Sequence, residues 1–146
     1  MSAPYRRILL VVDLSEESLG VGRRAQALAA ALNASMELLH VVEFVPVEPM
    51  GETLMPPVQI EEELLARARQ RLTALAGTLG LTGATCHVES GTVKAEIVRV
   101  AREREADLII LSSRERHGLS VLLNFTEDRV LHAAPCDVLA MRTGRT

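Results

Sequence analysis

The residues best placed for chemistry lie in the segment Ser112–Thr126, which follows a strongly apolar run near the end of the chain. A segment in this position binds phosphate in many α/β proteins, and a phosphate site needs bare backbone N–H groups, close approach of the main chain and positive potential. This segment contains a single glycine, Gly118, and the carboxylates Glu127 and Asp128 follow it directly. The residue types therefore argue against a tight polyphosphate site.

The composition limits the fold and the possible partners. The chain has 146 residues, 48% of them hydrophobic, which is enough for one domain over 1–146 with a core of its own. Only 2% of the residues are aromatic, so bases of single-stranded nucleic acid would find no platform for stacking. A net charge of −3 also argues against the basic face that nucleic acid requires. We expect no nucleic-acid partner.

The sequence also bears on location and on metal binding. No apolar run approaches the roughly 18 residues that span a bilayer, and the chain enters a strand after Arg6 and Arg7 without a signal peptide. No ligand spacing typical of a metal site occurs, and Cys86 and Cys136 are interpreted as small core residues of a reduced protein. We expect a soluble, cytoplasmic protein with no membrane or metal partner.

The elements that must position the segment alternate between apolar runs and helical patterns. Strands are predicted at 8–12, 36–42, 85–89, 107–111 and 136–141, and helices from Ser15 to Leu32 and at 58–79, 93–105 and about 126–133. Alternating strands and helices demand a parallel sheet with helices on both faces. We predict a single doubly wound, five-stranded α/β sheet with strand order 3-2-1-4-5, a flavodoxin-like layout shared with adenine nucleotide alpha hydrolases.

Smaller features of this pattern complete the prediction. Ser15 is predicted as the N-cap of the first helix, which Asn33 ends. A proline-rich loop covers 43–57. The charged side of the helix over 58–79 is interpreted as a solvated surface; its members are Glu61, Glu62, Arg67, Gln70 and Arg71.

The predicted strand order places a crevice between the first and the fourth strands. Ligands of doubly wound sheets bind beyond the carboxyl ends of the strands, at the switch in strand order. Asp13 would face the segment that begins at Ser112 across that crevice. Asp13 could accept hydrogen bonds from a base or ribose, or it could simply cap the first helix and hold the loop.

Several motifs carry a resemblance to a known family. They are the opening RILLVVDLS at 7–15, LHV at 39–41, Gly91 before the third helix, and the ending VLHAAPCDVL at 130–139. In this order and at these spacings they resemble the universal stress protein family, and the resemblance covers essentially the whole chain. It implies a stress-response protein and a homodimer joined through the last strand, because members commonly pair in that way.

The family contains a group that holds ATP and a group that does not. The ATP holders carry Gly-x-x-Gly, a nine-residue spacer, and Gly followed by Ser or Thr. At the three glycine positions this chain has Ser112, Glu115 and Phe125, and only the final hydroxyl is present, as Thr126. The chain is therefore similar to the non-ATP, universal stress protein A type.

Physical arguments reach the same conclusion independently of the resemblance. Phe125 puts a bulky side chain where the main chain would lie against phosphate, and Glu115 adds negative charge. One carboxylate about 6 Å from a phosphate charge, at an effective dielectric near 20, costs on the order of 3 kcal/mol, roughly a hundredfold in affinity. Arg114, Arg116 and His117 could offset part of this cost. AMP, another small anion or an apolar guest stays open.

Two functions follow from these observations. The first is a non-enzymatic, dimeric stress or signalling protein with a degenerate nucleotide site and no cofactor. Its dimer contact would be the apolar last strand at Val138, Leu139 and Met141, unless the basic tail at Arg142 and Arg145 protects that edge. The second is a module that binds ATP or AMP, with weak hydrolysis or self-phosphorylation.

The nucleotide-binding alternative would use a defined set of pocket residues. These are Asp13 and the backbone at Val41 for the nucleoside, with Ser112, Arg114, Asn124 and Thr126 around the phosphates. No nucleophile and base stand together, so we expect no catalytic residue and no enzyme. His40 and His87 fall within strands and are interpreted as satisfied histidines. A flavin carrier and a phospho-receiver share the layout, but Asp13–Glu17 repels phosphate and Lys94 is the only lysine.

Overall fold

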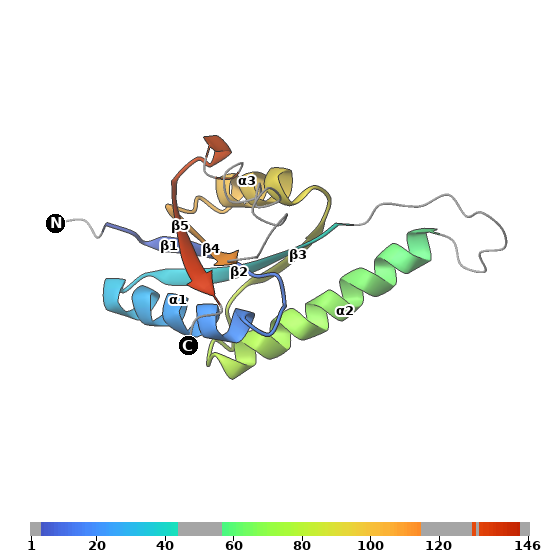
Figure 1. The fold of residues 1–146 in the computed structure, drawn as a ribbon, viewed down its shortest axis with the longest axis horizontal. Helices are drawn as coiled ribbons and strands as arrows, with labels where there is room; N and C mark the ends of the chain where they lie inside the picture. The colour runs from blue at the N-terminus through green and yellow to red at the C-terminus, as the bar shows by residue number, and fades with distance from the viewer. Residues whose placement is uncertain (1–3, 44–56, 115–129, 131, 144–146) are drawn as a thin grey trace.

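Strands and helices alternate along the chain, as the sequence predicts (Figure 1). The computed structural model describes residues 4–43, 57–114, 130 and 132–143. The strands are β1 (Arg7–Val11), β2 (Ser35–Val42), β3 (Cys86–Ser90), β4 (Leu108–Arg114) and β5 (Asp137–Thr143). The helices are α1 (Ser18–Leu32), α2 (Pro57–Thr78) and α3 (Val93–Glu103), and Val130, His132 and Ala133 are helical as well.

The strands form one parallel sheet in the order β3-β2-β1-β4-β5. This order and the parallel pairing confirm the predicted fold class. β1 lies in the middle, and its Val11 is level with Leu39 of β2 on one side and Leu111 of β4 on the other. β3 and β5 form the two edges of the sheet, which is where the sequence placed them.

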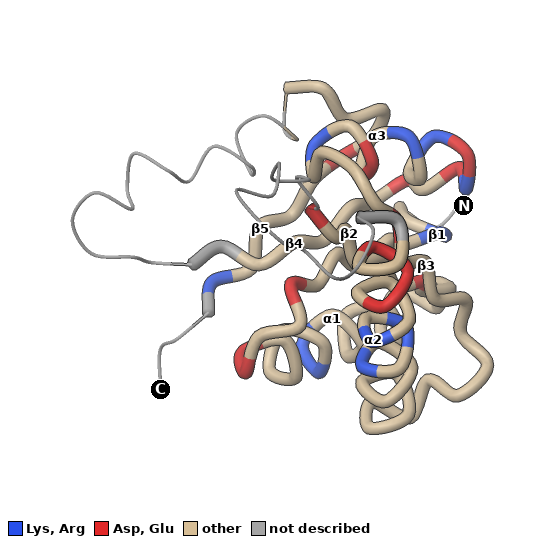
Figure 2. The backbone as a smooth tube through the Cα atoms, turned by 90° about the vertical axis from the view of Figure 1, so that its right-hand side faces the viewer, with Lys and Arg blue, Asp and Glu red and all other residues tan. Residues whose placement is uncertain are grey.

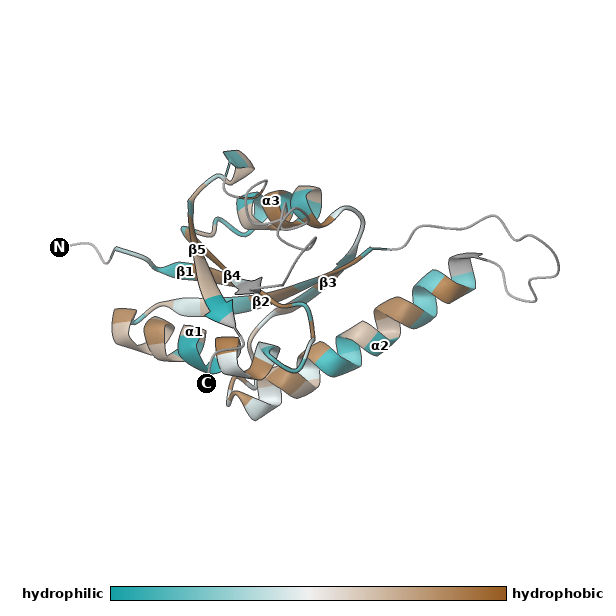
Figure 3. Cartoon of the chain, in the orientation of Figure 1, coloured by the Kyte–Doolittle hydropathy of each residue, from teal (hydrophilic) through white to brown (hydrophobic). Residues whose placement is uncertain are grey.

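Helices cover both faces of the sheet, with α1 and α2 on one face and α3 on the other (Figure 1). The central strands are apolar on both sides, so neighbouring residues enter different cores: Leu10 packs with Ala25 and Leu72, whereas Leu9 packs with Ile97. Hydrophobic residues accordingly line the strands between the helix layers (Figure 3). Both cores are aliphatic, because the chain has few aromatic residues.

The ends of α1 show one correct and one wrong prediction. Asn33 ends the helix in the left-handed conformation, with φ of 54°, and its N–H bonds to the carbonyls of Ala29 and Ala30, as expected of a C-cap. The predicted N-cap is wrong, because α1 begins at Ser18 and the N-cap position is Glu17. The hydroxyl of Ser15 instead donates a hydrogen bond to Oδ1 of Asp13 at 2.7 Å. None of the described helices is long and apolar enough to cross a membrane.

Candidate functional site

The carboxyl ends of β1, β2 and β4 meet at the switch in strand order, which lies between β1 and β4. The register carries Asp13 past Val11 to the same end of the sheet as Val41 and Ser112. Ligands of doubly wound sheets bind at this end. The structure therefore brings Asp13, Val41 and Ser112 of the predicted pocket set to one edge of the sheet.

The segment after β4 begins later than the sequence predicted. β4 runs to Arg114, not to Leu111, and its last residues Ser112 and Arg114 pair with Met141 and Thr143 of β5. The apolar run ends at Leu111, but pairing with β5 continues the strand beyond it, and that pairing has no local signal. Ser112 and Arg114 are thus strand residues. Asn124 and Thr126 of the predicted pocket lie outside the described residues.

The carboxylate of Asp13 is engaged by its own loop. Its Oδ1 accepts hydrogen bonds from the backbone N–H of Ser15 at 3.0 Å, from Oγ of Ser15 at 2.7 Å and from Oγ of Ser18 at 3.0 Å. Ser18 is buried, with 5% of its surface exposed, so its hydroxyl needs a partner inside the protein. These bonds hold the loop between β1 and α1, which is the structural role left open for Asp13.

The same loop is fixed from α2. Leu14 has a φ of 59°, in the left-handed region that non-glycine residues rarely adopt, and its side chain is buried. Nη2 of Arg71 donates a hydrogen bond to the carbonyl oxygen of Leu14. The sequence had assigned Arg71 to a solvated surface. No local pattern could have found this contact, because 57 positions separate the two residues.

His40 of β2 contacts the end of β1. Its Nδ1 lies 2.8 Å from the carbonyl oxygen of Val12. A carbonyl oxygen can only accept a hydrogen bond, so Nδ1 carries the proton. The interpretation of His40 as a satisfied strand histidine is confirmed, and the contact fixes the backbone directly before Asp13.

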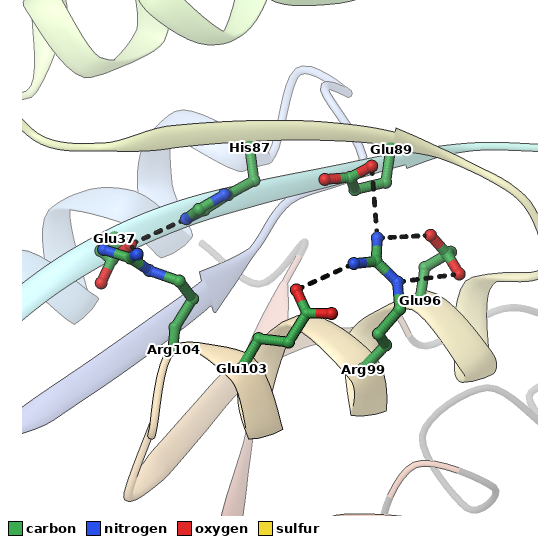
Figure 4. A network of polar contacts seen from close by, with 7 residues as sticks. All are labelled: Glu37, His87, Glu89, Glu96, Arg99, Glu103 and Arg104. Atoms are coloured by element: carbon green, nitrogen blue, oxygen red, sulfur yellow. Dashed lines mark hydrogen bonds and ion pairs between the residues drawn. The ribbon is translucent and has the colours of Figure 1, made fainter.

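A second polar cluster joins α3 to β2 and β3 (Figure 4). Glu37 of β2 accepts hydrogen bonds from Nε2 of His87 at 2.7 Å and from Nε of Arg104 at 2.9 Å. Burial alone would raise the pKa of Glu37, but the bonds from His87 and Arg104 outweigh it and hold that pKa below its ordinary value of 4.5. His87 is therefore satisfied, as predicted.

Arg99 of α3 is the centre of the other half of this cluster (Figure 4). Its guanidinium contacts Glu96 at 2.8 Å, Glu103 at 3.0 Å and Glu89 of β3 at 3.2 Å. Hydrogen bonds to Glu96 and then Glu103 raise the pKa of Arg99 above its ordinary range. The contact of Arg99 with Glu89 ties α3 to the edge strand β3, and the contact of Arg104 with Glu37 ties the end of α3 to β2. The seven residues of the cluster, drawn in Figure 4, contain no hydroxyl or thiol nucleophile.

The described residues offer little for metal or thiol chemistry. Among them, no group of three or more His, Cys, Asp or Glu side chains could hold a metal ion. Cys86 and Cys136 are free and half-buried, and burial raises the pKa of both thiols. A thiol with a raised pKa is a poor nucleophile at neutral pH. The edge that carries Asp13, Val41 and Ser112 is therefore the candidate site.

Comparison with known proteins agrees with the motifs. The model of the universal stress protein family matches residues 4–142. The chain is 38% identical over 138 residues to Universal stress protein A homolog 1 of Coxiella burnetii, covering 94% of this chain and 96% of the relative. The structure of universal stress protein UspA from Lactobacillus plantarum is 25% identical with a TM-score of 0.69, over 97% of this chain and 100% of that one. A universal stress protein solved in complex with cAMP is 24% identical with a TM-score of 0.64, over 98% and 100%.

Proposed function

The chain belongs to the universal stress protein family, as its motifs predicted, and on that premise we propose that it is a non-catalytic stress-response or signalling protein that acts as a homodimer. We further propose that it works in the cytoplasm and that its candidate site does not hold ATP in the manner of the ATP-binding members. Family membership supports the stress role. The remaining parts of the proposal depend on β5 and on Asp13.

The position of β5 supports the homodimer. Among the described residues β4 is its only strand partner, so one backbone edge of β5 is available for pairing with another chain. Val138 and Leu139 are half-buried, whereas Met141 is buried in the core of its own chain, with 6% exposed. The proposed contact therefore consists of the backbone edge together with Val138 and Leu139, and Met141 anchors the strand from inside.

Side chains fix both ends of β5. The hydroxyl of Tyr5 donates a hydrogen bond to Oδ2 of Asp137 at 2.7 Å, and Nη1 of Arg24 donates one to the carbonyl oxygen of Arg142 at 3.0 Å. A strand that is already fixed loses less conformational freedom when it pairs. The bond from Arg24, on α1, also indicates that the carbonyl of Arg142 points away from β4. Because backbone groups alternate along a strand, those of Ala140 point the same way.

The single observation that carries the ATP part of the proposal is the engagement of Asp13. Its Oδ1 already accepts hydrogen bonds from Ser15 and Ser18, so a nucleoside would compete with the loop for this carboxylate. The three family glycines are replaced by Ser112, Glu115 and Phe125, so the chain also lacks the bare backbone that polyphosphate needs.

One observation favours a second candidate function, the binding of a mononucleotide. A universal stress protein of this fold was solved in complex with cAMP. AMP and cAMP each carry one phosphate group, so they need fewer backbone donors than ATP and meet less repulsion from nearby carboxylates. The ribose or base of a mononucleotide would meet the same competition at Asp13 as that of ATP, so the phosphate side distinguishes the two candidates.

Thermal unfolding with and without nucleotides separates the two candidates. A ligand at a hundred times its dissociation constant adds about 2.7 kcal/mol to the free energy of unfolding. We expect no change in the melting temperature with millimolar Mg-ATP. A rise with AMP or cAMP alone would favour the mononucleotide candidate, and a rise with Mg-ATP would contradict the proposal.

A further inference from the structure

The first half of α2 carries an apolar stripe that lies outside both hydrophobic cores of the described residues. Ala68 and Leu72 belong to the core beneath the sheet, but Ile60, Leu64 and Leu65 belong to neither core and stay partly exposed. The reason is the course of the helix, because its first half extends past the end of the sheet (Figure 1). Apolar side chains in such a position are available to a partner.

Charged side chains border this stripe in a fixed order. Glu62 and Glu63 come first along the helix, Arg67 and Arg69 follow one to two turns later, and all four side chains are exposed. Figure 2 shows acidic and basic positions along α2. None of the four forms an ion pair with another residue that the structure describes, although Glu63 and Arg67 have the spacing for a pair within the helix. On α3, by contrast, Arg99 contacts three carboxylates.

When two copies of α2 lie antiparallel, the acidic residues of each copy stand opposite the basic residues of the other. At 3.6 residues per turn, Glu63 and Arg67 lie along one border of the stripe, and Glu62 and Arg69 lie along the other. In an antiparallel pair of α2 helices, Glu63 meets Arg67 of a second copy, and Glu62 meets Arg69. Both pairings place the twofold axis within half a residue of Leu65. Glu61 lies on the same side of the helix as the apolar residues, and with this axis it is level with Arg69 of the second copy, which gives its carboxylate a partner.

We propose that the first half of α2 packs antiparallel against the same helix of a second copy of this chain. Ile60, Leu64 and Leu65 form the apolar contact, and four ion pairs between acidic and basic residues set the direction and the register. A contact of this kind is isologous, since the same patch serves both copies. It uses no residue of β5, so it goes beyond the proposed dimer and does not depend on it.

The size of the contact sets its strength. Residues 60–69 span about 15 Å of helix, so the buried area falls below the roughly 1,000 Å² that a stable interface needs. Pairing through α2 is therefore weak and requires high protein concentration. A chain that also pairs through β5 has two twofold interfaces and forms tetramers or longer assemblies as the concentration rises.

Charge reversal tests the proposal by sedimentation velocity over a concentration series up to about 1 mM. The double variants Glu62→Arg/Glu63→Arg and Arg67→Glu/Arg69→Glu each turn four attractions into four repulsions. We expect each variant alone to raise the dissociation constant of the concentration-dependent step at least about tenfold. An equimolar mixture of the two variants restores association, because one stripe is then bordered only by arginines and the other only by glutamates.

The fourfold variant that exchanges all four charges is the control for folding and for net charge. It keeps the composition of the wild type and should regain self-association, whereas added salt should weaken the wild-type step. If the dissociation constant is the same for the wild type, both double variants and their mixture, the proposal is wrong. The apolar stripe would then contact something other than a second copy of this helix. The test stays readable whether the chain at low concentration is a monomer or a dimer, because none of the four charges lies on β5.

Discussion

Arg71 on α2 donates a hydrogen bond to the carbonyl oxygen of Leu14, in the loop between β1 and α1. Leu14 has a left-handed backbone conformation. Its neighbour Asp13 accepts a hydrogen bond from the N–H of Ser15 in the same loop. α2 therefore helps to determine the geometry of the candidate site, although it covers the sheet from outside. The position of Asp13 is a property of the tertiary structure as much as of the loop sequence.

The contact between Arg71 and Leu14 predicts a measurable contribution to stability. Arg71→Ala leaves the carbonyl of Leu14 without this donor, and we expect the free energy of unfolding to fall by about 1–2 kcal/mol. Arg23→Ala removes an exposed arginine of α1 and should change it by less than about 0.5 kcal/mol. Chemical denaturation of both variants provides the comparison. Equal stabilities would show that the hydrogen bond contributes nothing.

Asp13 and Ser18 should behave as a coupled pair. Asp13→Ala leaves the buried hydroxyl of Ser18 without its acceptor, so we expect a loss of about 1–3 kcal/mol. Ser18→Ala removes that hydroxyl, and the double variant should lose less than the two single variants together. A double-mutant cycle from denaturant unfolding measures the coupling. Strict additivity would contradict the role assigned to Asp13.

Glu37 predicts a dependence of stability on pH. Its pKa is lower in the folded chain than its ordinary value, so its contribution is complete above about pH 4.5 and is lost as the pH falls through the folded pKa. Glu37→Gln removes the charge, so the wild type should exceed this variant by on the order of 1 kcal/mol near pH 7. The difference should shrink towards about pH 3. A difference that stays constant with pH would argue against the contacts of Glu37 with His87 and Arg104.

Ala140 tests the proposed pairing of β5. The N–H of Ala140 points to the open edge of the sheet, so Ala140→Pro removes a donor for a second copy but none for β4. We expect Ala140→Pro to be monomeric at concentrations where Ala140→Ser, which keeps the N–H, is dimeric. Sedimentation of both variants distinguishes them, and circular dichroism checks that each is folded. A dimeric Ala140→Pro variant would place the interface elsewhere.

Local patterns in the sequence predicted the order of the elements, the edge positions of β3 and β5, and the end of α1 at Asn33. These features follow from runs of apolar residues and from single residues with strong conformational preferences. The N-cap was mispredicted because the hydroxyl of Ser15 donates its hydrogen bond to Asp13 and not to the helix. The end of β4 was mispredicted because pairing with β5 extends the strand to Arg114. Of the predicted pocket, Asn124 and Thr126 lie outside the described residues.

The missed contacts share one physical cause. Arg71 meets Leu14, and Arg104 meets Glu37, across 57 and 67 positions of sequence. A side chain whose partner is so distant looks like any other charge on a solvated helix. Such contacts depend on how α2 and α3 pack on the sheet, which no local spacing encodes.

Native mass spectrometry of freshly purified protein tests the central claim most directly, because one spectrum reports the number of subunits and any bound small molecule. We predict the mass of two chains with no nucleotide. A single chain, or a complex that carries ATP, would contradict the account.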